Sequence, residues 1–256
     1  GQWRWYWFLR VQLQVARRLG RICTVSEASA NDLEEEYGLR SDQLRVVGNG
    51  INLDVFNPMP EVERQAERLI TILSADSPLK GFPHLLEAVA ELRRRRPGLR
   101  LTVIGAPGLK SPTKALIKRL GVGDAIEFTG KVSAEQIARR YAEATVAVVP
   151  SLYEGFGFPA GEAMACKVPV VTTRGGALPE VVGDDGRCGL LVEPGSAGAL
   201  VEGVETLLND PVRRAAMGEA GRQRVERLFT WRRSAERTVE VYREMLGPRT
   251  RERAAC

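Results

Sequence analysis

The sequence predicts an α/β fold with a Rossmann-like parallel sheet and helices on both faces of the sheet. From residue 69 onward, short, apolar, β-branched runs alternate with amphipathic stretches of helical length, which is typical of βαβ units. Most of these runs end in turns rich in glycine, proline or serine. A parallel sheet binds its ligands at the carboxyl ends of its strands, so these turns are expected to share one pocket.

The elements of this region follow from the pattern in chain order. Strands are predicted at residues 69–73, 99–104, 125–128, 145–149, 168–172 and 189–192. Helices are predicted at residues 83–96, 111–120, 134–144, 197–209 and 211–228. The first helix carries Leu85, Leu86, Val89 and Leu92 on one face, as expected for a helix that packs on a sheet.

Further elements flank this region. A strand is predicted at residues 21–26, with Ser26 capping a helix through Tyr37, and another strand at residues 44–47. Thr230 and Trp231 open a last helix that runs to about residue 246. Residues 3–19 are dense in aromatic residues and arginine, and the alternatives are an interfacial membrane helix and packing within a domain.

Composition excludes several classes of protein. No segment approaches 18 uninterrupted apolar residues, so no membrane-spanning helix is expected. The cysteines show no C-x-x-C spacing and the only histidine is His84, which argues against a structural zinc site or a disulfide framework and favours a reducing cytoplasm. His84 opens a helix, where a surface or capping role is preferred to catalysis.

The net charge of +5 comes largely from a run of arginines at residues 93–96 and from the arginine-rich end of the chain. We expect solvated helix ends there, with a peripheral contact to anionic lipid headgroups at the inner face of the membrane as the alternative. Nucleic acid is not an expected partner, because no aromatic interleaving or binding motif accompanies the arginines.

The most informative segment runs from Glu154 to Glu162 and places two carboxylates around a glycine-rich turn. It follows a predicted strand and precedes a helix expected to begin at Glu162, with that acid in its first turn. The exposed N–H groups of such a turn and helix start favour an anion, typically a diphosphate. Carboxylates beside an anion site are explained if they accept hydrogen bonds from hydroxyls, those of a ribose and of a second sugar.

This segment resembles the paired-glutamate signature of retaining glycosyltransferases of family 4, which have the GT-B fold of two facing Rossmann-like domains. Further motifs agree in the family's order: residues 46–52, 80–81, 103–105, 128–132, 175–180 and 189–195. A lone glycine-rich turn would be weak evidence, whereas several motifs in order are specific. The similarity covers residues 22–246.

The resemblance implies a role for each matching residue. Glu154 would bind the hydroxyls of the donor sugar near the reacting face, and Glu162 the ribose. The loop would line the diphosphate at Phe156, Gly157, Phe158 and Pro159, although Pro159 has no N–H to donate. The two phenylalanine rings are expected to pack rather than stack on the ligand. Gly105, Gly130 and Val132 belong to loops that would approach the nucleobase through backbone groups, or simply end strands.

Lys80 matches the lysine that, in the family, holds the diphosphate together with an arginine. The family's Gly-Arg pair is replaced here by Ser74 and Ala75, which removes one charge-assisted donor. We expect Lys80 and Glu154 to act in catalysis. The alternative for Lys80 is an ordinary surface lysine, and the alternative for Glu154 a solvated loop acid. Gly175, Gly176 and Glu180 fit a turn into a helix, where their role is structural.

The resemblance also implies a domain organisation. Residues 1–57 would be the remnant of an acceptor-binding domain with the interdomain segment, and residues 58–229 the donor-binding domain. Residues 230–246 would form a helix that packs back on the first domain, followed by a tail at 247–256. The chain is therefore expected to be a fragment, able to bind donor but scarcely to turn it over. The apolar face of its last helix would favour self-association.

The expected function is transfer of a sugar, with retained configuration, from a nucleotide-diphosphate sugar to a hydroxyl of a glycan, lipid or small molecule. UDP is the preferred nucleotide and GDP the second. No cofactor is expected, and no divalent metal either, because the chain has no D-x-D sequence. The alternative is a catalytically weak nucleotide-sugar-binding module. A glycosidase fits poorly, because such an enzyme needs no phosphate-binding loop.

Overall fold

The computed structural model describes residues 11–74, 77–108 and 111–246. They belong to two compact units: the described residues between 51 and 230 form the larger, and residues 11–50 together with 231–246 form the smaller. Most of the aromatic part of the segment at residues 3–19, Ala75 and the predicted tail at 247–256 lie outside the described residues.

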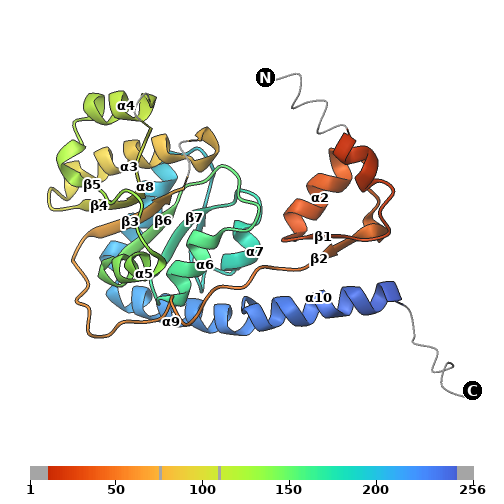
Figure 1. Cartoon of the computed structure of the whole chain (residues 1–256). Helices are drawn as coiled ribbons and strands as arrows, with labels where there is room; N and C mark the ends of the chain where they lie inside the picture. The colour runs from red at the N-terminus through yellow and green to blue at the C-terminus, as the bar shows by residue number, and fades with distance from the viewer. Residues whose placement is uncertain (1–10, 75–76, 109–110, 247–256) are drawn as a thin grey trace, which may run out of the picture. The chain divides into compact units, whose positions relative to one another are not determined.

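The larger unit contains a parallel sheet of six strands in the order β5-β4-β3-β6-β7-β8 (Figure 1). The strands are β3 (Arg68–Leu73), β4 (Arg100–Gly105), β5 (Ile126–Phe128), β6 (Val146–Val149), β7 (Val170–Thr173) and β8 (Leu190–Val192). All of them lie within two residues of their predicted bounds, and the predicted Rossmann-like sheet is confirmed.

The strand order reverses between β3 and β6. The chain runs outward from β3 to β4 and β5, and then returns to place β6 on the other side of β3, where Leu69 pairs with Val146. In open α/β sheets such a reversal leaves a crevice at the carboxyl ends of the two central strands, and ligands bind there.

Helices cover both faces of this sheet (Figure 1). Their bounds are α3 (Phe82–Arg95), α4 (Pro112–Leu120), α5 (Ala134–Glu143), α6 (Phe158–Ala165), α7 (Leu178–Val182), α8 (Ala197–Asn209) and α9 (Pro211–Leu228). On one face α3 packs against α8, and on the other α6 packs against α5, α7 and α9. Serine caps begin several of them at the predicted places, at Ser111, Ser133 and Ser196.

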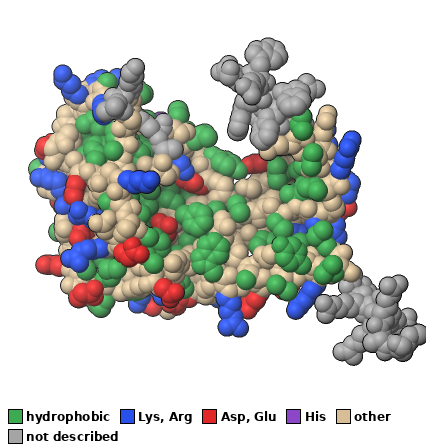
Figure 2. Space-filling view, viewed as in Figure 1, with side chains coloured by type: hydrophobic (Ala, Val, Ile, Leu, Met, Phe, Trp, Pro, Cys, Tyr) green, Lys and Arg blue, Asp and Glu red, His purple; other side chains and the backbone are tan. Residues whose placement is uncertain are grey.

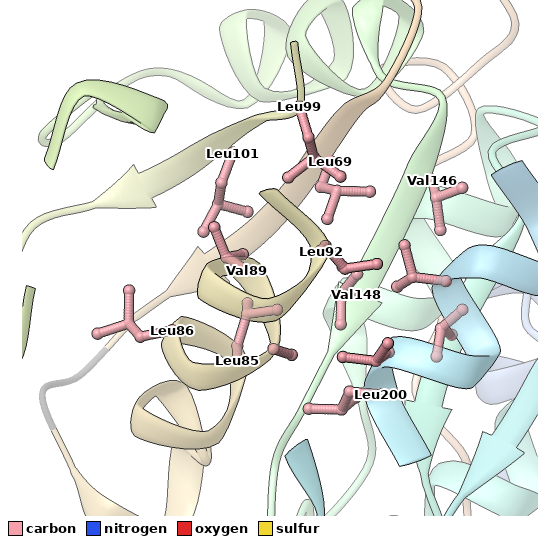
Figure 3. Packing of buried hydrophobic residues seen from close by; sticks show 14 of the residues in the cluster. Leu69, Leu85, Leu86, Val89, Leu92, Leu99, Leu101, Val146, Val148 and Leu200 are labelled. Atoms are coloured by element: carbon pink, nitrogen blue, oxygen red, sulfur yellow. The ribbon is translucent and has the colours of Figure 1, made fainter. Parts of the chain in front are cut away.

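The main core lies between α3, α8 and the central strands (Figure 3). The predicted apolar face of α3 is fully buried there, together with Leu69 and Leu101 of the sheet and Leu200 of α8. Each such side chain contributes about 1.5–3 kcal/mol relative to an exposed one. This packing fixes β3 and α3, between which Lys80 lies.

The arginines of the larger unit are mostly engaged within it. Arg93 pairs with Asp124, Arg95 with Glu205 and Arg96 with Glu67. On α9, Arg224 donates to the carbonyls of Glu180 and Val181, which end α7. Acidic and basic side chains are interspersed on the face of this unit shown in Figure 2. The arginine run at the end of α3 thus forms ion pairs within this unit, and a contact of these residues with lipid headgroups stays a prediction.

The smaller unit holds β1 (Ile22–Thr24) and β2 (Leu44–Val46), which pair in parallel, with α2 (Glu27–Glu35) and α10 (Trp231–Leu246). Ser26 caps α2 as predicted, although the helix ends at Glu35 rather than Tyr37. Arg45 forms an ion pair of 2.8 Å with Glu244 of α10.

The exposed side of α10 carries Tyr242, Met245 and Leu246, and self-association through it stays a prediction. None of the helices described for this chain is both long and apolar enough to cross a bilayer.

Candidate functional site

Two charged side chains meet at the reversal point of the sheet. Lys80 lies in the loop after β3, at the end of a short 3-10 turn that Ser77 caps, and Glu154 lies in the loop after β6. The Lys80 ammonium is 2.8 Å from Oε1 of Glu154, and their side chains are 24% and 11% exposed. Since β3 and β6 are neighbours, the strand order brings together two residues that are far apart in sequence.

Gly81 allows the loop of Lys80 to lie this close. Its φ of 61° is in the left-handed region, and a Cβ there would overlap the carbonyl oxygen of Pro150 at the end of β6. The N–H of Leu152 donates to the carbonyl of Leu79 at 2.7 Å. The two loops are therefore joined by backbone contacts as well as by the ion pair.

Ser151 also binds Glu154, and the sequence reasoning did not single it out. Its hydroxyl donates to the same Oε1 at 2.7 Å, and its side chain is buried, with 2% of the residue exposed. The sequence offers one weak signal for it, a polar residue just past the apolar strand β6 and three residues before Glu154.

The loop between Glu154 and α6 presents unpaired backbone donors. Within the described chain, no acceptor binds the N–H groups of Phe156, Gly157 and Phe158. Gly157 has φ 102° and caps α6, which begins at Phe158 and carries Pro159 in its first turn. Adjacent free amides at a helix start form a concavity that favours an anion. Phe156 is buried against Phe158 and Phe229, whereas Phe158 is exposed.

Glu162 lies in the second turn of α6, so the prediction that this helix begins at Glu162 is wrong. Alternating glycine and proline residues are atypical of a helix interior, which is why the sequence predicts a later start. Pro159 is compatible with a first helical turn because its missing N–H would have no partner there. Gly161 lies in the helix because a Cβ would approach Ile51 Cδ1 to 2.8 Å, which leaves no room for a larger residue.

Burial raises the pKa of Glu162 to about 7, and a hydrogen bond with Tyr141 lowers it in part. Tyr141 comes from α5 and is 1% exposed; its hydroxyl donates to the carbonyl of Pro159 at 3.0 Å. Burial and the neighbouring Glu162 raise the pKa of the Tyr141 phenol well above its ordinary value. Sequence reasoning missed Tyr141 because it reads as an ordinary core residue of an amphipathic helix.

The loop after β7 packs directly on the Glu154 segment. Gly176 has φ 61°, and a Cβ at this position would overlap the carbonyl oxygen of Glu154. That carbonyl accepts from the N–H of Ala177 at 2.8 Å. A Cβ on Gly175 would similarly overlap the backbone of Leu152. The structural role expected for these glycines is thus to support the backbone that carries Glu154.

Gly105 and Gly130 lie at the ends of β4 and β5 and bind each other. Their N–H and carbonyl groups form reciprocal hydrogen bonds of 3.1 and 3.2 Å. The N–H groups of both glycines are therefore already used, and backbone donors for a nucleobase at this edge would have to come from neighbours such as Val132, which is half-buried.

Two other features bear on ligands. The described part of the chain contains no group of three His, Cys, Asp or Glu side chains arranged to hold a metal ion. His84 lies in the first turn of α3, with its Nδ1 3.9 Å from Glu87.

Comparison with known proteins agrees with this geometry. Residues 57–224 match the model of the family described as glycosyl transferases group 1, and residues 1–55 match that of glycosyltransferase family 4. The MMP alpha-(1->4)-mannosyltransferase of Mycolicibacterium hassiacum is 42% identical over 95% of this chain and 59% of its own length. The D-inositol 3-phosphate glycosyltransferase of Kineococcus radiotolerans is 35% identical over 94% of this chain and 61% of its own length.

Among solved structures, sucrose-phosphate synthase from Thermosynechococcus elongatus superposes with a TM-score of 0.81 at 28% identity, over 93% of this chain and 61% of that one. The chain thus spans about three fifths of the length of these relatives. The match to the group 1 model covers most of the larger unit, including Lys80, Glu154 and Glu162. The chain belongs to the glycosyl transferases group 1 family, whose solved members have the GT-B fold.

Proposed function

We propose that the larger unit binds a nucleotide-diphosphate sugar and serves as the donor half of a retaining glycosyltransferase. The observation that carries this proposal is the Lys80–Glu154 pair beside the free amides of Phe156, Gly157 and Phe158. One cation and several N–H groups suit a diphosphate, and a fixed carboxylate next to them suits the hydroxyls of the attached sugar.

In this function each group has a separate task. Lys80 and the loop amides stabilise the charge that develops on the departing nucleotide diphosphate. The bond between the anomeric carbon and the phosphate oxygen breaks, and a bond to the acceptor oxygen forms on the same face. The acceptor proton passes to the departing phosphate. Glu154 orients the donor sugar, and Glu162 accepts hydrogen bonds from the ribose.

The relatives suggest a hexose as the transferred sugar. One relative is named a mannosyltransferase, which makes mannose the first sugar to test. Others are named D-inositol 3-phosphate glycosyltransferases, which places a phosphorylated polyol among the candidate small-molecule acceptors, beside glycans and lipids. UDP and GDP are the first nucleotides to test. The UDP-glucose complex among the structural neighbours is only 23% identical and supports the fold alone.

A second candidate is a nucleotide-sugar-binding module of low catalytic power. Two observations favour it: Glu154 already neutralises Lys80, and residues 74–75 lack the arginine expected in that loop. The two functions differ in turnover rather than in binding, because both require the donor site.

The test is isothermal titration of the whole chain with UDP, GDP and ADP, without added metal, followed by the sugar conjugate of the nucleotide that binds best. Saturable binding of one nucleotide supports the proposal and names the base. Absence of binding by a chain whose circular dichroism shows the α/β fold would overturn it. Hydrolysis of the bound sugar nucleotide then separates the enzyme from the module.

A further inference from the structure

Ser151 is a buried polar residue in contact with Glu154 of the candidate site. It lies two residues after the end of β6, and its carbonyl accepts a hydrogen bond from the hydroxyl of buried Thr173 on β7. Its own hydroxyl is 2.7 Å from Oε1 of Glu154. A buried hydroxyl needs a partner, and here that partner is a carboxylate that the proposed function uses.

The two donors to Glu154 converge on one oxygen. Ser151 Oγ and Lys80 Nζ lie 2.7 Å and 2.8 Å from Oε1. The other oxygen, Oε2, has no hydrogen-bond partner among residues 11–74, 77–108 and 111–246. An ionised carboxylate accepts at both oxygens, so the unused one remains available to a ligand.

We propose that Ser151 is a positioning residue that fixes Oε1 of Glu154, so that Oε2 accepts a hydroxyl of the transferred sugar. This inference rests on the proposed function. Lys80 would divide its hydrogen bonds between Glu154 and the incoming diphosphate, whereas the Ser151 hydroxyl donates to Glu154 alone. Ser151 is therefore the donor that keeps the carboxylate oriented when the Lys80 ammonium binds the diphosphate.

A specific consequence follows for binding. Ser151 acts on the sugar through Glu154 and contacts neither the diphosphate nor the base. Removal of its hydroxyl should therefore weaken binding of a nucleotide sugar and leave binding of the free nucleotide almost unchanged. A general loosening of the loop would instead lower the affinity for both ligands equally.

The experiment compares Ser151→Ala with the wild-type chain by titration with the nucleoside diphosphate that binds and with its hexose conjugate: GDP and GDP-mannose, or UDP and UDP-glucose. We expect affinity for the conjugate to fall about tenfold, the usual effect of losing one hydrogen bond to a charged group, and affinity for the free nucleotide to change less than about twofold. In a Glu154→Gln background, Ser151→Ala should have no further effect on the ratio of the two affinities.

The matched control is Thr102→Val, which removes a buried hydroxyl of β4 that binds Arg68, and both affinities should stay unchanged. If Ser151→Ala does not fold, Ser151→Cys keeps most of the volume with a weaker donor, and the same selective loss is expected. Equal losses for both ligands, or no loss for the conjugate, would overturn the inference. A folded wild-type chain that binds neither ligand would overturn the proposed function and the inference with it.

Discussion

The ammonium of Lys80 and Oε1 of Glu154 lie 2.8 Å apart across the reversal point of the sheet, between the loops that follow β3 and β6. The ion pair means that a diphosphate entering this site meets a cation already balanced by a carboxylate. Each charge also compensates the other, which matters because neither side chain is more than 24% exposed and an unpaired charge there would be costly.

Replacement of Lys80 by Ala should weaken nucleotide-diphosphate binding by about 2 kcal/mol, or roughly thirtyfold. The variant loses a charged donor and leaves Glu154 unpaired beside the phosphates. Titration with the nucleotide that binds wild type measures the loss. The double variant Lys80→Ala/Glu154→Gln removes that repulsion and should regain part of the affinity.

Lys118→Ala is the control for this variant, because Lys118 is an exposed lysine in the last turn of α4. It should bind nucleotide like wild type. If Lys80→Ala also binds nucleotide with wild-type affinity, then Lys80 is an ordinary surface lysine, as the alternative interpretation has it.

Much of the fold was predictable because its elements have strong local signals. The apolar strands and the face of α3 appear in the sequence at nearly the observed bounds. The meeting of Lys80 and Glu154 was also within reach, because parallel strands bring the loops at their carboxyl ends together. The start of α6 could not be predicted, because its glycines and Pro159 are typical of a turn. Gly161 is in fact a helical residue, and its lack of a side chain leaves room for Ile51.

The residues behind the site could not be predicted, since their roles depend on side-chain direction across elements. Tyr141 reads as a core residue of α5, and only the packing of α5 on α6 brings its hydroxyl to Pro159. Ser151 is one of three serines just past a strand, with Ser26 and Ser74. Arg224 reads as part of a charged helix, although it binds the carbonyls that end α7.

Gly176→Ala should destabilise the chain by about 3 kcal/mol, because the new Cβ adds overlap with the carbonyl of Glu154 to the strain of positive φ. Gly186→Ala is the matched control, with φ 70° and open space around its Cβ. It should cost only about 1 kcal/mol, the backbone term alone. Urea unfolding measures the free energy of unfolding of both variants. Equal losses would show that the Glu154 loop can move away from the new Cβ at no cost.

A chelator should leave nucleotide binding unchanged. The positive groups that face the proposed diphosphate are Lys80 and backbone amides, and the sequence has no D-x-D motif. The nucleotide affinity measured in the presence of EDTA should agree within about twofold with the affinity measured in added Mg²⁺ or Mn²⁺. A marked gain of affinity with either ion would reject a metal-free donor site.

The raised pKa of Glu162 makes stability depend on pH. Its folded-state pKa of about 7 exceeds the ordinary value of 4.5, so the folded chain holds this proton more tightly than the unfolded chain. The stability contributed by this proton is complete below about pH 4.5 and is lost as pH rises to about 7. The loss amounts to about 3 kcal/mol from this one group.

Glu162→Gln should abolish this component, because the amide resembles the protonated acid and does not titrate. Urea unfolding at pH 5 and pH 8 should show wild type losing stability relative to the variant as pH rises, while Glu202→Gln, an exposed position on α8, follows wild type. The ionised form is also the better acceptor for ribose hydroxyls, so wild-type nucleotide affinity should rise over the same interval and the Glu162→Gln affinity should stay flat. Parallel stability curves for wild type and Glu162→Gln would mean that Glu162 is ionised in the folded chain throughout this range, in spite of its burial.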